Sequence, residues 1–132
     1  MLTIGTTVLG VQDVARATSF WRSALGYRPR QAGDETWVVL EPADEPGARL
    51  ALMLSETPSQ PRPRVHLDLY ADDPEAEIDR LLGLGATRVD WDRYPPNPDF
   101  AVLADPDGNR FCVIDKSGPP PTGDVPAGGT GG

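Results

Sequence analysis

Three residues with reactive side chains stand out in this sequence: His66, Asp68 and Cys112. His66 is the single histidine and lies two positions before Asp68, so a β-strand would place both side chains on one face. An imidazole beside a carboxylate can act as a general base or receive a hydrogen bond from a ligand. The same arrangement is also common in solvated surface pairs. The spacing therefore favours a polar element of a pocket, with a surface pair as the alternative.

Cys112 is the single cysteine, which excludes an internal disulfide framework and fits a reducing compartment. It lies between Phe111 and Val113 in an apolar run, where a thiol behaves as a small hydrophobic group. Arg110 is the one positively charged residue nearby in the sequence, and this single charge gives little reason to expect a lowered pKa for the thiol. We interpret Cys112 as lining a pocket or as an inert core residue, and not as a nucleophile.

The segment around His66 has the pattern of a β-strand. In residues 65–70, Val and Leu at the odd positions alternate with His66, Asp68 and Tyr70. This period of two predicts one apolar and one polar face. Residues 6–11 form a second strand-like segment, and each of the two segments leads into a helix signal.

Helix boundaries are marked twice by the same residue types. Asp13 and Asp73 can cap free N–H groups, and Pro74 suits the first helical position. Apolar residues then recur at helical spacing until Gly26 in one half and Gly85 in the other. Glycine tolerates the left-handed conformation that often ends a helix. The sequence therefore predicts one helix in each half.

Further strands are predicted after each helix. Short apolar segments follow the first helix at 37–40 and 50–54, and the second at 87–91, 100–104 and 110–114. The last two are separated by Asp105-Pro106-Asp107-Gly108-Asn109, a composition typical of a tight turn.

The order of patterns therefore repeats, which predicts an α+β chain made of two β-α-β-β-β modules. One domain covers residues 1–116, with the first module at about 3–54 and the second at about 64–115. A linker with three prolines, 55–63, separates them. The Gly/Pro-rich tail, 117–132, has few apolar side chains to bury and is predicted to be disordered.

Charge and hydropathy exclude several classes of protein. The formal net charge is −8 and no basic cluster is present, so nucleic-acid binding is disfavoured. No segment reaches the roughly 18 apolar residues of a membrane span, and no signal peptide is recognisable. We expect a soluble cytoplasmic protein with no membrane partner. The acidity could attract a cationic small molecule or could serve solubility alone.

Four segments together resemble the vicinal oxygen chelate superfamily, which includes glyoxalases, bleomycin-resistance proteins and extradiol dioxygenases. They are Val11-Gln12-Asp13-Val14, Phe20-Trp21, Leu25-Gly26-Tyr27 and the segment from Asp105 to Phe111. The resemblance covers roughly residues 3–115, and the last segment is most similar to the glyoxalase-like domain subgroup. It implies a cupped mixed sheet with helices on the outside, whose cup binds a divalent metal or a small organic molecule.

The resemblance also points to four metal-ligand positions. His66 matches one, whereas Thr6 and Ala51 occupy two others, and Cys112 stands where many members have Glu. A catalytic metal needs about three suitable protein ligands, and hard cations prefer oxygen to sulfur. The resemblance therefore implies no metal site and no cofactor in this chain.

The leading hypothesis is a metal-independent small-molecule-binding protein of the bleomycin-resistance type, acting as a homodimer. The residues expected to line its cup are His66, Asp68, Cys112, Thr6, Trp37, Trp91 and Phe100. Aromatic walls with a few polar groups suit a flat organic ligand.

Two alternatives remain open. One is a lyase, isomerase or dioxygenase-like enzyme of the same fold, with His66 as metal ligand or acid-base group. The other is a protein-interaction module with a collapsed cup, whose function is dimer assembly. Whether the protein turns over a substrate stays undecided by the sequence.

Overall fold

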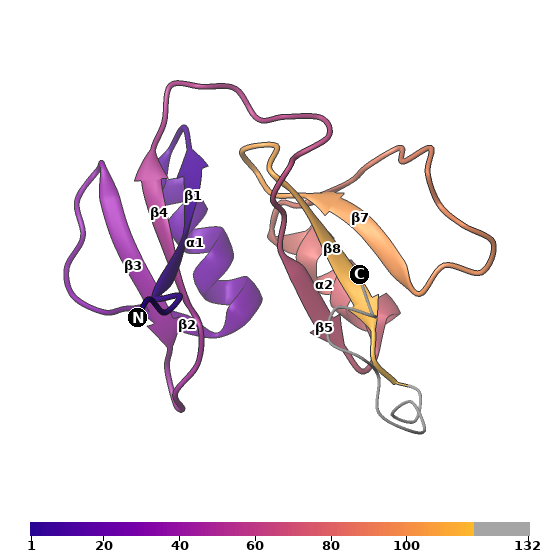
Figure 1. Cartoon of the computed structure of the whole chain (residues 1–132), viewed down its shortest axis with the longest axis horizontal. Coiled ribbons are helices and arrows are strands. Elements are labelled where there is room, and N and C mark those ends of the chain that lie inside the picture. Colours follow the sequence, from indigo (N-terminus) through magenta and orange to yellow (C-terminus); the bar gives the residue numbers. More distant parts are fainter. Residues whose placement is uncertain (118–132) are drawn as a thin grey trace.

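The structure is a computed structural model that describes residues 1–117 of the chain. The first half consists of β1 (Thr6–Val11), α1 (Val14–Leu25), β2 (Tyr27–Pro29), β3 (Trp37–Pro42) and β4 (Arg49–Leu54). The second half repeats this order with β5 (Asp68–Ala71), α2 (Pro74–Leu84), β6 (Thr87–Arg88), β7 (Phe100–Ala104) and β8 (Arg110–Asp115). Figure 1 shows the two halves joined by a long connection.

Each half forms its own four-stranded mixed sheet. The strand orders are β1-β4-β3-β2 and β5-β8-β7-β6, so the topology repeats as well as the element order. In both sheets the first and last strands of the half are parallel neighbours, and the remaining pairs are antiparallel. The predicted α+β class and the two β-α-β-β-β modules are confirmed.

The helices begin and end at the predicted residues. The carboxylate of Asp13 accepts a hydrogen bond of 3.0 Å from a backbone N–H in the first turn of α1, and that of Asp73 accepts one of 3.2 Å in α2. Gly26 and Gly85 follow the helices with φ of +68° and +118°, a region where a side chain would be strained. Local sequence signals thus determine both helices.

The two helix-covered sheet faces share one hydrophobic core. α1 lies between the two sheets (Figure 1), and its Trp21 contacts Phe111 of β8 with ring centroids 5.3 Å apart. Because both halves direct their helix sides inward, the sheet faces without helices point away from each other. The largest fully buried side chains of the protein are Trp21, Phe111, Leu40, Leu52, Leu103, Ile114, Val11 and Val113.

The turn before β8 joins the halves by hydrogen bonds. The carboxylate Oδ1 of Asp107 accepts from the backbone N–H of Gln12 at 2.8 Å and from the guanidinium of Arg16 at 2.9 Å. The side-chain amide of Asn109 donates to the carbonyl of Gly10 at 2.9 Å. A segment with the composition of a simple turn is therefore also the link between the second half and the start of α1.

The strand predicted at 65–70 is shorter in the structure and begins at Asp68. Val65, expected on the apolar face, is 80% exposed, although the backbone N–H of Cys112 still donates to the carbonyl of Leu67 at 2.9 Å. Alternation indicates which residues share a face, but the end of a strand depends on where its partner pairs. The partner of β5 is β8, which lies more than 40 residues away.

Two other strands differ from expectation. The strand predicted at 87–91 is only Thr87–Arg88. The backbone N–H of Val89 still donates to the carbonyl of Val102 at 3.2 Å before the chain leaves the sheet in a loop. The short β2 was missed because three residues are too few to show a period. Among the described residues, no helix is both long and apolar enough to cross a membrane. The prediction that the tail is disordered concerns residues outside the described part of the chain, from 118 onward.

Candidate functional site

His66, Asp68 and Cys112 meet on the face of the second sheet that no helix covers. Asp68 is the register partner of Cys112 in the parallel β5–β8 pair. The imidazole Nε2 of His66 lies 2.9 Å from Oδ1 of Asp68, and donor atoms of all three residues lie within 4.8 Å of one another. An ionised carboxylate can only accept hydrogen bonds, so Nε2 carries the proton in this pair. The other ring nitrogen, Nδ1, is then available to a ligand.

The thiol of Cys112 is held in its protonated form. Burial raises its pKa to about 11, and the negative charge and hydrogen bonding of Asp68 act in the same direction. Only the thiolate is a strong nucleophile. At neutral pH Cys112 therefore offers a small, weakly polar surface and not a nucleophile.

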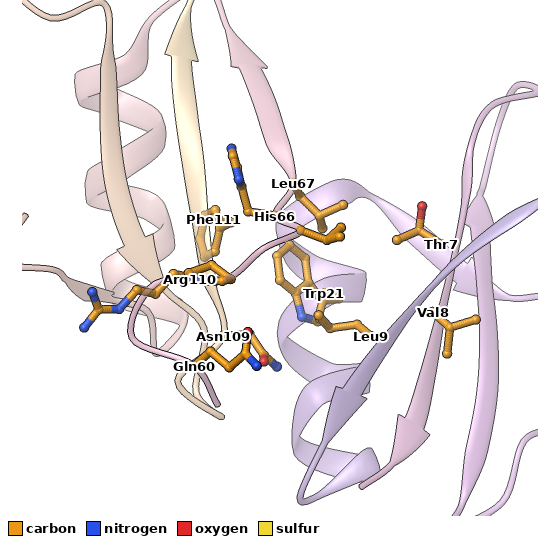
Figure 2. Close-up of a pocket in the computed structure, with 12 residues that line it drawn as sticks. Thr7, Val8, Leu9, Trp21, Gln60, His66, Leu67, Asn109, Arg110 and Phe111 are labelled. Atoms are coloured by element: carbon orange, nitrogen blue, oxygen red, sulfur yellow. The ribbon is translucent and has the colours of Figure 1, made fainter. Parts of the chain in front are cut away.

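A pocket of about 300 Å³ opens beside this cluster. Its lining combines aromatic and apolar side chains with an imidazole and two guanidinium groups: Pro63, His66, Trp91, Arg93, Phe100, Val102, Arg110, Phe111 and Cys112. Figure 2 shows His66, Arg110 and Phe111, which also line a smaller neighbouring cavity between the halves. An apolar pocket with a few convergent polar groups is typical of small-molecule sites.

One wall of the pocket is fastened to the linker by Arg62. A guanidinium nitrogen of Arg62 lies 3.0 Å from both carboxylate oxygens of Asp92, and the guanidinium carbon lies 5.8 Å from the ring centroid of Trp91. The hydrogen bond from Arg62 lowers the pKa of the Asp92 carboxyl. The linker and the loop after β6 are thereby joined next to the indole of Trp91.

A second contact in the same loop positions the other aromatic wall. The backbone N–H of Val102 donates to the phenolic oxygen of Tyr94 at 2.7 Å, and the Tyr94 ring packs on Phe100 with centroids 5.2 Å apart. Phe100 is therefore held by its strand on one side and by the loop on the other. Phe100 and Trp91 both line the pocket.

The structure brings together most of the residues proposed from the sequence. The pocket is lined by four of them: His66, Cys112, Trp91 and Phe100. A fifth, Asp68, is hydrogen-bonded to the imidazole of His66. Thr6 and Trp37 lie on the first sheet and do not line this pocket. Ligand binding by each of these residues stays a prediction.

Sequence reasoning missed Arg93 and Arg110 as lining residues. Arg110 precedes Cys112 by two positions on β8, so the alternation that selected Cys112 also selects Arg110. Arg93 lies in an irregular loop, where no periodicity indicates the direction of a side chain. Its place in the pocket depends on how that loop folds over the sheet.

Two other hollows are less suited to an organic ligand. A cavity of about 120 Å³ lies between the halves, bordered by Leu9, Trp21 and Leu67 (Figure 2). A wider hollow of about 670 Å³ beside the start of α1 has no aromatic, histidine or cysteine side chain in its lining. The smaller one offers little room, and the wider one has carboxylates in its lining but no aromatic side chain to pack on a ring.

The donor atoms near His66 do not match a hard-metal centre. They are one imidazole nitrogen, one carboxylate and one buried thiol that would have to lose its proton. Thr6 and Ala51, at the corresponding positions of the first half, offer no comparable ligands and lie on the other sheet. Mixed nitrogen, oxygen and sulfur donors suit zinc better than magnesium or manganese.

Paired β-α-β-β-β halves, each with its own four-stranded mixed sheet, define a class of two-module α+β proteins. The family model of the Glyoxalase-like domain matches residues 6–114. The chain belongs to this family, and its resemblance to the vicinal oxygen chelate superfamily is confirmed.

Solved structures share the fold at low sequence identity. A gene product of Arabidopsis thaliana is 21% identical, with a TM-score of 0.69 over 87% of this chain and 100% of that one. A glyoxalase-related enzyme from Fulvimarina pelagi is 17% identical, with a TM-score of 0.65 over 88% and 89%. The fosfomycin resistance protein FosX from Mesorhizobium loti is 20% identical, with a TM-score of 0.65 over 90% and 94%. No curated protein sequence matches the chain significantly.

Proposed function

We propose that this protein binds a small organic ligand, without a metal, in the pocket on the second sheet. The observation that carries the proposal is the convergence of Trp91, Phe100 and His66 around about 300 Å³ of space. Two aromatic side chains in one pocket suit a flat ring system, and the imidazole can orient a polar group.

The test is a screen of aromatic compounds of mixed charge against protein stripped of metal with a chelator. A compound that binds the folded state raises the melting temperature in proportion to the logarithm of its concentration over Kd. Binding is then located by the indole N–H signals of the three tryptophans in NMR spectra. We expect a shift at Trp91 and none at the buried Trp21.

A pair of variants separates the pocket from the rest of the sheet. Trp91→Ala removes one aromatic wall and should weaken binding at least tenfold. Tyr70→Ala alters an exposed aromatic residue on β5 that does not line the pocket, and it should bind as the parent does. Equal binding by both variants would contradict the proposed location.

An enzyme of the same fold is the second candidate, because the 2.9 Å contact between His66 and Asp68 is a suitable acid-base arrangement. Two of the structural relatives are described as an enzyme and as an antibiotic resistance protein. Here His66 would move a proton in a lyase or isomerase step, or would bind a metal in a dioxygenase-like reaction. Consumption of a bound compound, lost in His66→Gln while binding persists, would favour this candidate.

We also propose that the protein is a cytoplasmic homodimer. The helix-free face of the first sheet carries an apolar surface formed by Val8, Trp37 and Met53, which are 47%, 41% and 45% exposed. Register places Met53 directly opposite Trp37, so these side chains are contiguous. A second copy would cover this surface and the open edge of β1. Light scattering should give twice the chain mass for the parent protein. Met53→Glu places a charge on this surface and should give a smaller mass. A monomeric parent protein would contradict the proposal.

A further inference from the structure

We propose that the pocket selects aromatic ligands that carry an anionic group, such as an aryl carboxylate. This inference rests on the proposed function and specifies the chemistry of its ligand. It is carried by Arg93 and Arg110, the two guanidinium groups in the lining. The same pocket is lined by Trp91 and Phe100, so a ring and an anion can be recognised together.

Arg93 and Arg110 have no direct carboxylate partner among residues 1–117, although the charge of Arg93 also acts on the neighbouring Asp92. Within residues 1–117, five other arginines form ion pairs with carboxylates: Arg16, Arg28, Arg49, Arg62 and Arg80. Neither Arg93 nor Arg110 makes one in this part of the chain. A guanidinium prefers a carboxylate that can accept two parallel N–H bonds. The guanidinium groups of Arg93 and Arg110 can therefore donate hydrogen bonds to an anionic group of a ligand.

Two carboxylates beside pocket-lining residues already have partners. Asp92 is paired with Arg62, and Asp68 accepts from His66 and lies against the thiol of Cys112. No carboxylate appears in the lining itself. Arg93 and Arg110 are thus the charged side chains that line the pocket itself, with the carboxylate of Asp68 behind His66 and Cys112.

The pocket is therefore opposite in sign to the chain as a whole, which has a formal net charge of −8. Net charge acts at long range and is screened within about 8–10 Å at physiological salt, whereas contacts inside a pocket are screened much less. Local guanidinium groups should consequently outweigh the distant acidic surface. A cationic ligand, which the net charge alone would favour, should be rejected here.

Three probes of the same ring system provide the test: 1-naphthoate, 1-naphthamide and 1-naphthylmethylammonium. Titration calorimetry and the Trp91 indole signal should both report 1-naphthoate as the tightest, by about tenfold or more over the amide. The ammonium compound should bind weakest, and raising the salt concentration should weaken 1-naphthoate alone. Binding of the amide or the ammonium compound as tightly as 1-naphthoate would overturn charge selection and leave the proposed function standing. Failure of all three to perturb Trp91 would count against the aromatic pocket, and with it the proposed function.

Matched variants identify the groups responsible. Arg93→Gln and Arg110→Gln each remove one charge at nearly constant size and should weaken 1-naphthoate about tenfold while leaving 1-naphthamide nearly unchanged. Arg30→Gln is the control, since Arg30 is exposed in the first half and lies outside the pocket. If the Arg110→Gln protein binds both probes equally weakly, the substitution has damaged the fold. Its melting temperature checks this. Unchanged 1-naphthoate binding in well-folded Arg93→Gln and Arg110→Gln proteins would refute the assignment.

Discussion

The indole N–H of Trp21 donates a hydrogen bond of 3.2 Å to the carboxylate of Asp105, although 84 residues separate the two. Trp21 is 1% exposed and Asp105 is 2% exposed, so the bond lies inside the core that joins both halves. Burial raises the pKa of the Asp105 carboxyl, and the hydrogen bonds from Asn109 and Trp21 partly oppose this effect. Removing the indole donor should therefore leave a buried charge with fewer partners.

Trp21→Phe should lower the free energy of unfolding at pH 7 by about 1–3 kcal/mol, because an aromatic ring is kept but a donor to a buried carboxylate is lost. A carboxyl whose pKa is raised by folding favours the folded state below its ordinary pKa and loses this contribution as pH rises. The destabilisation should thus be larger at pH 7 than at pH 4, measured by urea unfolding. Tyr70→Phe, at an exposed position, is the control. Equal unfolding curves for Trp21→Phe and the parent would contradict this prediction.

The core side and the pocket side of the second half should respond differently to mutation. Phe111→Ala should cost about 3–5 kcal/mol of stability, since the ring is 2% exposed and packs on Trp21. His66→Ala should change stability little, because its side chain is 38% exposed, but should weaken ligand binding. Thermal unfolding and calorimetry separate the two effects. A folded His66→Ala protein that binds as tightly as the parent would remove His66 from the site.

Cys112 should react slowly with iodoacetamide. A pKa of about 11, against an ordinary 9.0, lowers the thiolate fraction near pH 8 about 100-fold. Asp68→Asn removes a negative charge beside the thiol and should speed alkylation, whereas Asp72→Asn, at an exposed position outside this cluster, should not. A pKa raised by folding also means that this thiol disfavours the folded state as pH rises from 9 towards 11. Mass spectrometry of the alkylated protein measures the rate, and rapid labelling of folded parent at pH 8 would disprove the assignment.

The purified protein should contain no stoichiometric catalytic metal. The first half supplies Thr6 and Ala51 at two expected ligand positions, and the second half offers a thiol that keeps its proton. Elemental analysis after chelation and reloading with zinc, nickel, manganese or iron should give far less than one ion per chain. About one bound ion, lost in His66→Ala, would show that His66, Asp68 and Cys112 form a metal centre.

Truncation after Lys116 should leave the melting temperature nearly unchanged. This follows from composition, because residues 117–132 contain few apolar side chains to offset the entropy of ordering them. Calorimetry of the full and shortened chains compares the two directly. A fall of many degrees on truncation would mean that the tail docks on the domain.

Much of this fold could be predicted because its signals are local. The caps at Asp13 and Asp73 act on N–H groups three residues away, and Gly26 and Gly85 act at their own backbone angles. The repeat of these signals was enough to indicate two equivalent modules. The alternation that separates Phe111 from Cys112 likewise needs only the geometry of one strand.

The composition of the pocket was decided by tertiary structure. Arg93 and Trp91 reach it only because a loop, fastened by Arg62 and Tyr94, folds over the second sheet. Thr6 and Trp37 are absent from it because the helix sides of both sheets share one core and turn the other faces apart. Such contacts join residues far apart in the chain and depend on how whole sheets pack, which no local pattern encodes. The sequence by itself therefore determined the elements and the side-chain faces of the strands, and packing decided which side chains meet.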